Sequence, residues 1–230
     1  MISINNISFY YNKEKPIFNN LSLSFEANAI NGIVGLNGSG KSTLLNLIYK
    51  FLKTDSGEIL LNNAPINRRD IAFLESENYF YPNTTGFEYL SLFSNRSFDI
   101  EKWNTLFNLP LNSLVTDYSV GMKKRLAIFG LIKQNKSVLM LDEPFNGLDI
   151  ESVAMLRELL VILAKQGKTI LLTSHLLPLM GELCNLVFYI KSPNEVLTIS
   201  ADDFSHFAEN LLTSLGQQQR DEILRVVDYK

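Results

Sequence analysis

Residues 35–43 form a glycine-rich stretch, GLNGSGKST, that ends in a lysine and two hydroxyl residues. Its spacing, G-x-x-x-x-G-K-S/T, is typical of a loop whose backbone N–H groups surround phosphate oxygens. Glycine permits the tight curl that turns successive N–H groups inward, and the positive end of a following helix adds to the attraction. We therefore expect the whole stretch to bind phosphate: Gly35, Leu36, Asn37, Gly38, Ser39, Gly40, Lys41, Ser42 and Thr43.

Two residues near the end of this loop have more specific chemistry. The ammonium group of Lys41 is expected to reach the β- and γ-phosphates of a nucleotide. The hydroxyl of Ser42 is expected to ligate Mg²⁺, an ion that prefers octahedral oxygen coordination. The alternative is a glycine-rich turn that contains a lysine by chance. The complete motif and its position between a predicted strand and a predicted helix argue against that alternative.

Two adjacent carboxylates follow a second apolar run, SVLMLDEP at residues 137–144. The run predicts a buried strand, and open α/β sheets bind ligands beyond the carboxyl ends of their strands. Asp142 is expected in the coordination shell of Mg²⁺. Glu143 points to a different side and is the candidate to orient or deprotonate an attacking water.

The residues around these motifs predict an α/β fold. Its core is expected to be the parallel sheet of a P-loop NTPase. Residues 29–35 read as a buried strand that feeds a helix through residues 41–52. Alternating apolar residues in two segments near the N-terminus predict a subdomain of antiparallel strands, and two more strands are expected before residue 76. After residue 137, strands and helices alternate as in parallel βαβ units. The predicted strands before residue 76 are 1–11, 18–28, 56–63 and 68–75.

The segment at about residues 85–133 has apolar residues at three- and four-residue spacing, which predicts an inserted helical subdomain. The tail at about residues 192–230 is more polar, and we expect it to end in one or two short helices. No repeat or low-complexity linker divides the chain, so residues 1–230 are interpreted as a single domain.

Composition restricts the classes of partner and compartment. No apolar run approaches the roughly 18 residues of a membrane-spanning helix, and the first residues lack the order of a signal peptide, so a cytoplasmic protein is expected. A net charge of −3 without a long like-charge run argues against nucleic acid as a partner. The single cysteine, Cys184, excludes an internal disulfide and is expected to pack as a small apolar residue.

Four motifs together resemble the ATP-binding subunit of an ABC transporter, over roughly residues 2–190. They are the phosphate loop, LMLDEP, NGLD at residues 146–149 and LLTSH at residues 171–175. The resemblance implies that ATP and Mg²⁺ are bound. It also implies that Tyr11 stacks on adenine, with Tyr10 as the alternative, that Asp149 communicates across a dimer interface, and that His175 donates a hydrogen bond to the γ-phosphate.

The stretch YSVGM at residues 118–122 lies where the family has its LSGGQ signature, one helix before the acid pair. Ser119 and Gly121 are retained, while Val120 replaces the first glycine of the signature. A hydroxyl, backbone N–H groups and a helix N-terminus suffice to contact a phosphate of a partner subunit, unless residue 120 needs a positive φ. The form resembles a subgroup of exporter-type subunits, and we expect it to work.

The family normally has a glutamine after the strand that ends near Leu74, and this chain has none there. The equivalent position is Ser76, or Glu75 or Glu77 if the alignment shifts by one residue. Ser76 is expected to bind Mg²⁺ through a water. The aromatic residues 79–81 either line a groove for a helix of a membrane subunit or pack beneath the helical subdomain.

The expected function is that of an ATP-hydrolysing subunit that dimerises head to tail around two ATP–Mg²⁺ and drives export through a separate transmembrane permease. The catalytic groups are expected to be Lys41, Glu143 and His175. The dimer is either a homodimer or a heterodimer with a second ATPase, located at the cytoplasmic face of the membrane. The alternatives are a soluble assembly or remodelling ATPase and a weakly hydrolysing, nucleotide-sensing regulatory subunit.

Overall fold

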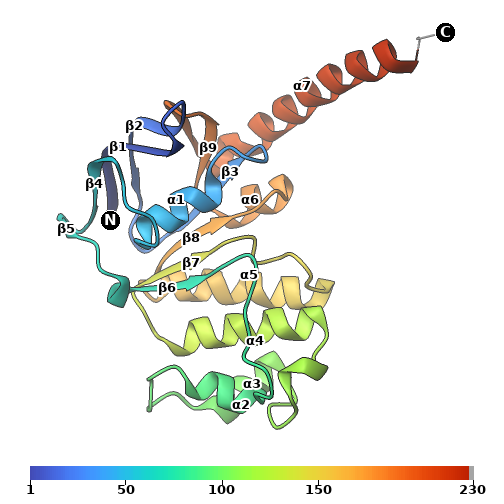
Figure 1. Cartoon of the computed structure of the whole chain (residues 1–230). Coiled ribbons are helices and arrows are strands. Elements are labelled where there is room, and N and C mark those ends of the chain that lie inside the picture. The colour runs from blue at the N-terminus through green and yellow to red at the C-terminus, as the bar shows by residue number, and fades with distance from the viewer. Residues whose placement is uncertain (228–230) are drawn as a thin grey trace.

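The computed structural model describes residues 1–227, except for the side chain of Gln218, and contains two sheets (Figure 1). The first is antiparallel, with strand order β2-β1-β4-β5. Its strands are β1 (Ile2–Asn12), β2 (Lys15–Phe25), β4 (Ser56–Leu61) and β5 (Ala64–Pro65). The predicted N-terminal antiparallel subdomain is therefore present.

The second sheet has the order β10-β9-β3-β8-β7-β6, and all its neighbours are parallel except β10 and β9. Its strands are β3 (Ile30–Gly35), β6 (Ile71–Leu74), β7 (Val138–Leu141), β8 (Thr169–Thr173), β9 (Leu186–Ser192) and β10 (Glu195–Ser200). Short apolar runs form this sheet because parallel strands are covered on both faces. The predicted α/β fold class is confirmed. The carboxyl ends of β3, β6, β7 and β8 lie at one edge.

Helices cover both faces of the parallel sheet. Three helices and a 3₁₀ turn occupy residues 86–133 and lie in the lower part of Figure 1, whereas α1 lies in the upper part. The helices are α1 (Lys41–Ile48), α2 (Gly86–Ser91), α3 (Ile100–Phe107), α4 (Val120–Lys133), α5 (Ile150–Lys165), α6 (Leu177–Leu183) and α7 (Ala201–Val227); the 3₁₀ turns are η1 (Arg68–Asp70) and η2 (Val115–Asp117).

Strand β7 divides the hydrophobic interior into two clusters, since successive side chains of a strand point to opposite faces. Val138 and Met140 pack with the antiparallel sheet and α1. Leu139 and Leu141 pack with the helices of residues 86–133 and with α5. All four side chains are at most 2% exposed, so β7 is anchored from both sides and holds the residues that follow it in place.

Two helix predictions were wrong in extent. Helix α1 ends at Ile48 and not at residue 52, since Lys50 adopts a left-handed φ of 62° that no helix continues through. The tail contains a strand, β10, before a single helix of 27 residues, α7. Pairing with β9 forms this strand, and Phe204 anchors the start of α7 in the core. Residues 228–230 of the predicted tail lie outside the described residues.

None of the helices in the described part of the chain combines the length and hydropathy needed to cross a membrane.

Cys184 follows α6 and is only 3% exposed. Burial raises the pKa of its thiol to about 12. Because the thiolate is the reactive form, we expect a thiol-specific disulfide reagent to modify the native protein at least about a hundred-fold more slowly than the chain unfolded in guanidinium chloride. Comparable rates in the two states would contradict this buried position.

Candidate nucleotide site

The phosphate loop begins at the end of β3 and leads directly into α1. Gly38 and Gly40 adopt left-handed φ values of 77° and 103°, which a residue with a Cβ atom rarely adopts. Gly40 is the N-cap of α1, and no side chain caps this helix end. The N–H groups of its first turn are therefore free of side-chain partners and can donate to an anion.

The space around the loop fits a phosphate chain. A Cβ at Gly38 would meet no atom within 4 Å, whereas a Cβ at Gly35 would lie 2.5 Å from the hydroxyl of Ser39. That hydroxyl is buried and has no hydrogen-bond partner among the described residues. The open side of the loop at Gly38 and the helix N-terminus at Gly40 are where a bound anion would fit.

Lys41 lies over the loop rather than away from it. Its ammonium group donates to the backbone oxygens of Gly35 at 2.9 Å and Leu36 at 3.2 Å. Both partners are neutral carbonyls, so its charge is not neutralised by them. The adjacent Ser42 is exposed at the start of α1, while Leu36 and Asn37 form the exposed outer side of the loop.

Tyr11 is brought beside the phosphate loop by the antiparallel sheet. Its phenolic oxygen lies 3.3 Å from the hydroxyl oxygen of Thr43, and the side chain is 64% exposed. Phe9 supports the ring in an edge-to-face contact with centroids 4.9 Å apart. An exposed flat ring next to the phosphate loop can stack on a base, which favours Tyr11 over Tyr10 as the base-stacking residue.

The acid pair is organised by Thr173 at the end of β8. The Thr173 hydroxyl donates to Oδ1 of the 4%-exposed Asp142 at 2.6 Å and accepts the backbone N–H of Glu143 at 2.9 Å. Strand β8 lies between β7 and β3, so the carboxylates meet the edge where the phosphate loop begins. One threonine therefore holds both acids in a defined orientation.

Glu143 and His175 are in direct contact. The His175 Nδ1 atom lies 2.9 Å from Glu143 Oε2, and the His175 side chain is 57% exposed against 16% for Glu143. Glu143 has a left-handed φ of 49°, an unusual backbone state that costs roughly 1–3 kcal/mol. The Glu143 carboxylate also accepts the backbone N–H of His175 at 3.4 Å. The two residues can act on one group.

Ser119, Gly121 and Asp149 form a second cluster away from the phosphate loop. Ser119 is the N-cap of α4 and accepts the N–H of Met122 at 3.2 Å, while Asp149 is the N-cap of α5. The hydrogen bond from the Ser152 backbone lowers the pKa of the Asp149 carboxyl. A Cβ at Gly121 would lie 3.1 Å from a backbone oxygen of the loop before Asp149, so the two helix starts are close.

Val120 is compatible with this arrangement. It is the first residue of α4, it is 74% exposed, and its φ is not in the left-handed region. The loop therefore does not need a glycine at this position. Figure 1 shows α4 and α1 in separate parts of the molecule, so the cluster around Ser119 faces no phosphate loop of its own chain.

The loop after β6 places Ser76 next to α4, the helix that begins within the YSVGM stretch. Its backbone oxygen accepts a hydrogen bond from the ammonium group of Lys124 at 3.2 Å. Glu75 and Glu77 line a neighbouring cavity of about 210 Å³. The contact between Ser76 and α4 is thus made by the Ser76 backbone.

The aromatic residues 79–81 differ in burial. Phe80 packs on the core, with its ring centroid 4.9 Å from that of Tyr89. Tyr79 and Tyr81 are 75% and 59% exposed and contact each other edge to face.

Residues 18–146 match the protein family described as ABC transporter, a span that includes the phosphate loop, Ser119 and the acid pair. This chain belongs to that family. Its ATP-binding subunits are the members that it resembles over almost its whole length, as the following relatives show.

The chain is 28% identical to the lantibiotic transport ATP-binding protein SrtF of Streptococcus pyogenes, over 91% of this chain and 95% of that protein. It is 30% identical to the uncharacterized ABC transporter ATP-binding protein YdbJ of Bacillus subtilis, over 90% of this chain and 71% of that protein. A solved ATP-binding subunit of an ABC transporter has the same fold, with a TM-score of 0.80, 22% identity and coverage of 88% and 91%.

Two residues of this ABC subunit were not predicted as part of its site. Thr173 lies within LLTSH, and its place at the end of a strand next to the acid strand was the available signal. Lys124 lies in α4, is 5% exposed and has a pKa lowered by burial, although the charges of Asp142 and Glu143 oppose that shift. No sequence signal distinguishes it from its basic neighbours Lys123 and Arg125.

Lys124 is expected to act as a positioning residue for hydrolysis. Lys124→Met removes the charge near the acid pair and the donor to Ser76, and we expect kcat to fall roughly tenfold, the effect of losing one charge-assisted hydrogen bond. ATP affinity should change little, because the phosphate loop is untouched. Steady-state phosphate release as a function of ATP concentration would measure both quantities.

The matched control is Lys123→Met, which removes the neighbouring and less buried charge. Lys124→Arg keeps a cationic donor and should recover most of the rate. If Lys123→Met and Lys124→Met had the same kcat, the contact with Ser76 would have no part in hydrolysis.

Proposed function

We propose that this chain binds and hydrolyses ATP through a site at the carboxyl edge of its parallel sheet, and that hydrolysis powers a separate transmembrane permease. The observation that carries the proposal is the hydrogen-bonded set of Asp142, Thr173, Glu143 and His175 at the strand edge shared with the phosphate loop. ABC ATPase activity is the activity of the family to which the chain belongs.

In the proposed mechanism, the phosphate loop and Lys41 hold the triphosphate, and Tyr11 stacks on adenine. Glu143 orients the attacking water and accepts its proton, since its carboxylate is partly exposed and fixed by the backbone. His175 reaches the γ-phosphate by exchanging its contact with Glu143 for one with phosphate. These residues stabilise charge that spreads over the transferred phosphoryl group.

Ser42 and Asp142 are the residues that would hold Mg²⁺, and Ser76 would contact its shell through a water. A buried carboxylate and an exposed hydroxyl are hard oxygen donors of the kind that Mg²⁺ accepts. When bound, the ion neutralises phosphate charge and polarises the terminal phosphoryl group. The Thr173 hydroxyl orients the Asp142 carboxylate toward this task.

The second part of the proposal is a head-to-tail dimer. Ser119 and Gly121 lie at the N-terminal end of α4 and are separated from their own phosphate loop. In the dimer, each Ser119 would contact the nucleotide bound by the partner subunit, and Asp149 would lie at the interface. The exposure of Ser119 and Val120 supports this role, because it leaves both residues accessible to a partner subunit.

Export is the proposed direction of transport. A relative named for lantibiotic transport supports it, as does a putative multidrug export ATP-binding/permease protein of Staphylococcus aureus, with 32% identity over 76% of this chain and 34% of that protein. The exposed Tyr79 and Tyr81, beside the cavity lined by Glu75 and Glu77, are the proposed contact with the permease, at the cytoplasmic face of the membrane.

The test is phosphate release by the purified protein together with recovery of an affinity-tagged copy from detergent-solubilised membranes. We expect Mg²⁺-dependent hydrolysis that Lys41→Ala abolishes, and co-purification of a membrane protein with the tagged chain. Hydrolysis without any membrane partner would favour the soluble assembly ATPase. ATP binding without measurable turnover would favour a nucleotide-sensing subunit, to which the missing glutamine also points.

A further inference from the structure

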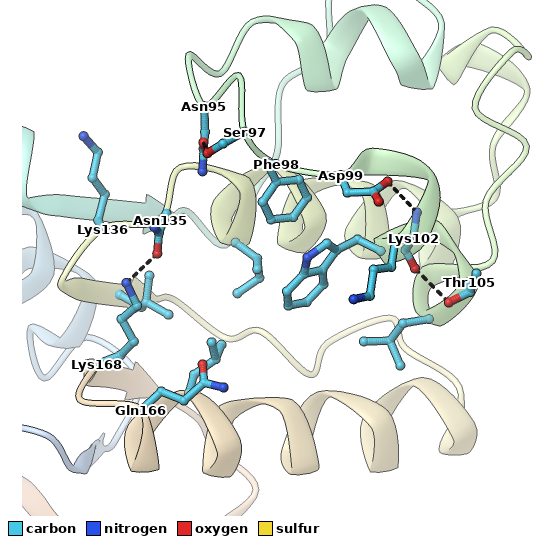
Figure 2. A pocket seen from close by; sticks show the side chains of 15 residues that line it. Asn95, Ser97, Phe98, Asp99, Lys102, Thr105, Asn135, Lys136, Gln166 and Lys168 are labelled. Carbon is cyan, nitrogen blue, oxygen red and sulfur yellow. Dashed lines mark hydrogen bonds between the residues drawn. The ribbon is translucent and has the colours of Figure 1, made fainter.

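A second pocket lies far from the phosphate loop, between α3, the end of α4 and the end of α5 (Figure 2). Its volume is about 610 Å³, within the range of roughly 300–1,000 Å³ that is usual for small-molecule sites. None of the predicted nucleotide-site residues lines it. The proposed function therefore leaves this pocket unexplained.

One wall of the pocket is aromatic and its floor is aliphatic. Phe98 and Trp103 are stacked, with centroids 5.2 Å apart and an angle of 21° between the ring planes. Leu106, Ile132, Leu139 and Leu163 complete the apolar part of the lining. Such a surface accommodates a flat apolar group.

The charged part of the lining is predominantly positive. It contains three lysines, Lys102, Lys136 and Lys168, and one carboxylate, Asp99. Asp99 caps α3, since its Oδ1 atom accepts the backbone N–H of Lys102 at 3.0 Å. Among the described residues, the ammonium groups of Lys102 and Lys136 have no hydrogen-bond or ion-pair partner.

Two of these lysines lie on opposite sides of the pocket. Figure 2 shows Lys102 on α3 with its ammonium group directed inward, Lys168 on the facing side and Lys136 directed away. The ammonium group of Lys168 donates to Asn135 Oδ1 at 2.7 Å, a neutral partner. Burial lowers the pKa of Lys168, so its charge is poorly solvated and an anion would stabilise it.

We infer that this pocket binds a small organic anion whose flat apolar body lies against Trp103 and whose negative charge is attracted by the positive charges of Lys102 and Lys168. A carboxylate or sulfonate on an aromatic ring system has this chemistry. The complementary features are the apolar floor, the stacked aromatic wall and the two opposed cations. The site is independent of the proposed ATP site.

The pocket lies at the opposite ends of the two helices that begin at the proposed dimer interface. It contacts the C-terminal ends of α4 and α5, whose N-terminal ends are capped by Ser119 and Asp149. A bound ligand would join these two helices to α3. This regulatory consequence rests on the proposed function, but binding itself does not.

Trp103 is the only tryptophan of the chain, so the donor of any energy transfer lies in this pocket, and the lysine substitutions below locate the bound probe. The probe is 8-anilinonaphthalene-1-sulfonate, an aromatic sulfonate that accepts energy from tryptophan. We expect saturable energy transfer from Trp103 to the probe, unaffected by saturating ATP–Mg²⁺. Lys102→Gln and Lys168→Gln should each raise the dissociation constant about five-fold, as for one partly exposed charge contact.

The matched control is Lys53→Gln, which removes one positive charge from the lining of a different cavity. It should leave the transfer unchanged. Wild-type affinity in both Lys102→Gln and Lys168→Gln, displacement by ATP–Mg²⁺, or an absence of energy transfer would each overturn the inference. None of these outcomes depends on whether the protein hydrolyses ATP.

Discussion

Glu143→Gln is expected to lower the rate of ATP hydrolysis by about a hundred-fold to ten-thousand-fold while ATP binding persists. The amide keeps the size of the side chain, and it can still form a hydrogen bond with His175 across the 2.9 Å contact. It cannot accept the proton of the attacking water, and a general base contributes a factor of this size. Single-turnover phosphate release and equilibrium ATP binding measure the two quantities separately.

Glu182→Gln is the matched control, because it makes the same chemical change in an exposed ion pair with Arg157. Its hydrolysis rate should equal that of the unchanged protein. Normal turnover by Glu143→Gln would mean that another group handles the water, and the role of Glu143 would then be limited to holding His175.

Ser119→Arg is expected to prevent the ATP-dependent dimer that Glu143→Gln would otherwise accumulate. An arginine at the N-cap of α4 removes the hydroxyl and introduces bulk where the nucleotide of the partner subunit would lie. Loss of one central contact of about 2 kcal/mol weakens association at least about thirty-fold. Light scattering of the Glu143→Gln protein, with and without ATP–Mg²⁺, measures the mass of the assembly.

Ser214→Arg in the same background is the control, since it places the same bulk on an exposed serine of α7. That variant should dimerise normally. A dimer that survives Ser119→Arg would place the interface elsewhere. A protein that stays monomeric without the Ser119 change would require a second ATPase or the permease as its obligate partner.

Much of the ATP site was predictable because it is local in the sequence. The phosphate loop is a contiguous run between a strand and a helix, and its spacing determines both its glycine conformations and its helix N-terminus. The acid pair follows an apolar run short enough to be a buried strand. The parallel sheet was also predictable, because strand and helix patterns alternate after residue 137.

The extents of some elements were not predictable from their own residues. The apolar pattern of residues 41–52 continues past the point where Lys50 ends the helix. Strand β10 was not predicted, although Val196, Thr198 and Ile199 are β-branched residues that favour a strand, and it pairs with β9. The end of α1 depends on the backbone conformation of Lys50, which the apolar pattern does not contain.

By itself the sequence determined which residues could bind phosphate and which could act as acids, since residue type and local spacing set those properties. Only the tertiary structure decided their partners: Thr173 with Asp142, His175 with Glu143, and Lys124 with the backbone of Ser76. These pairs are separated by 31, 32 and 48 residues. The first two contacts exist because parallel strands end at one edge of the sheet. The third exists because α4 packs against the same sheet. Neither arrangement is specified by a local sequence pattern.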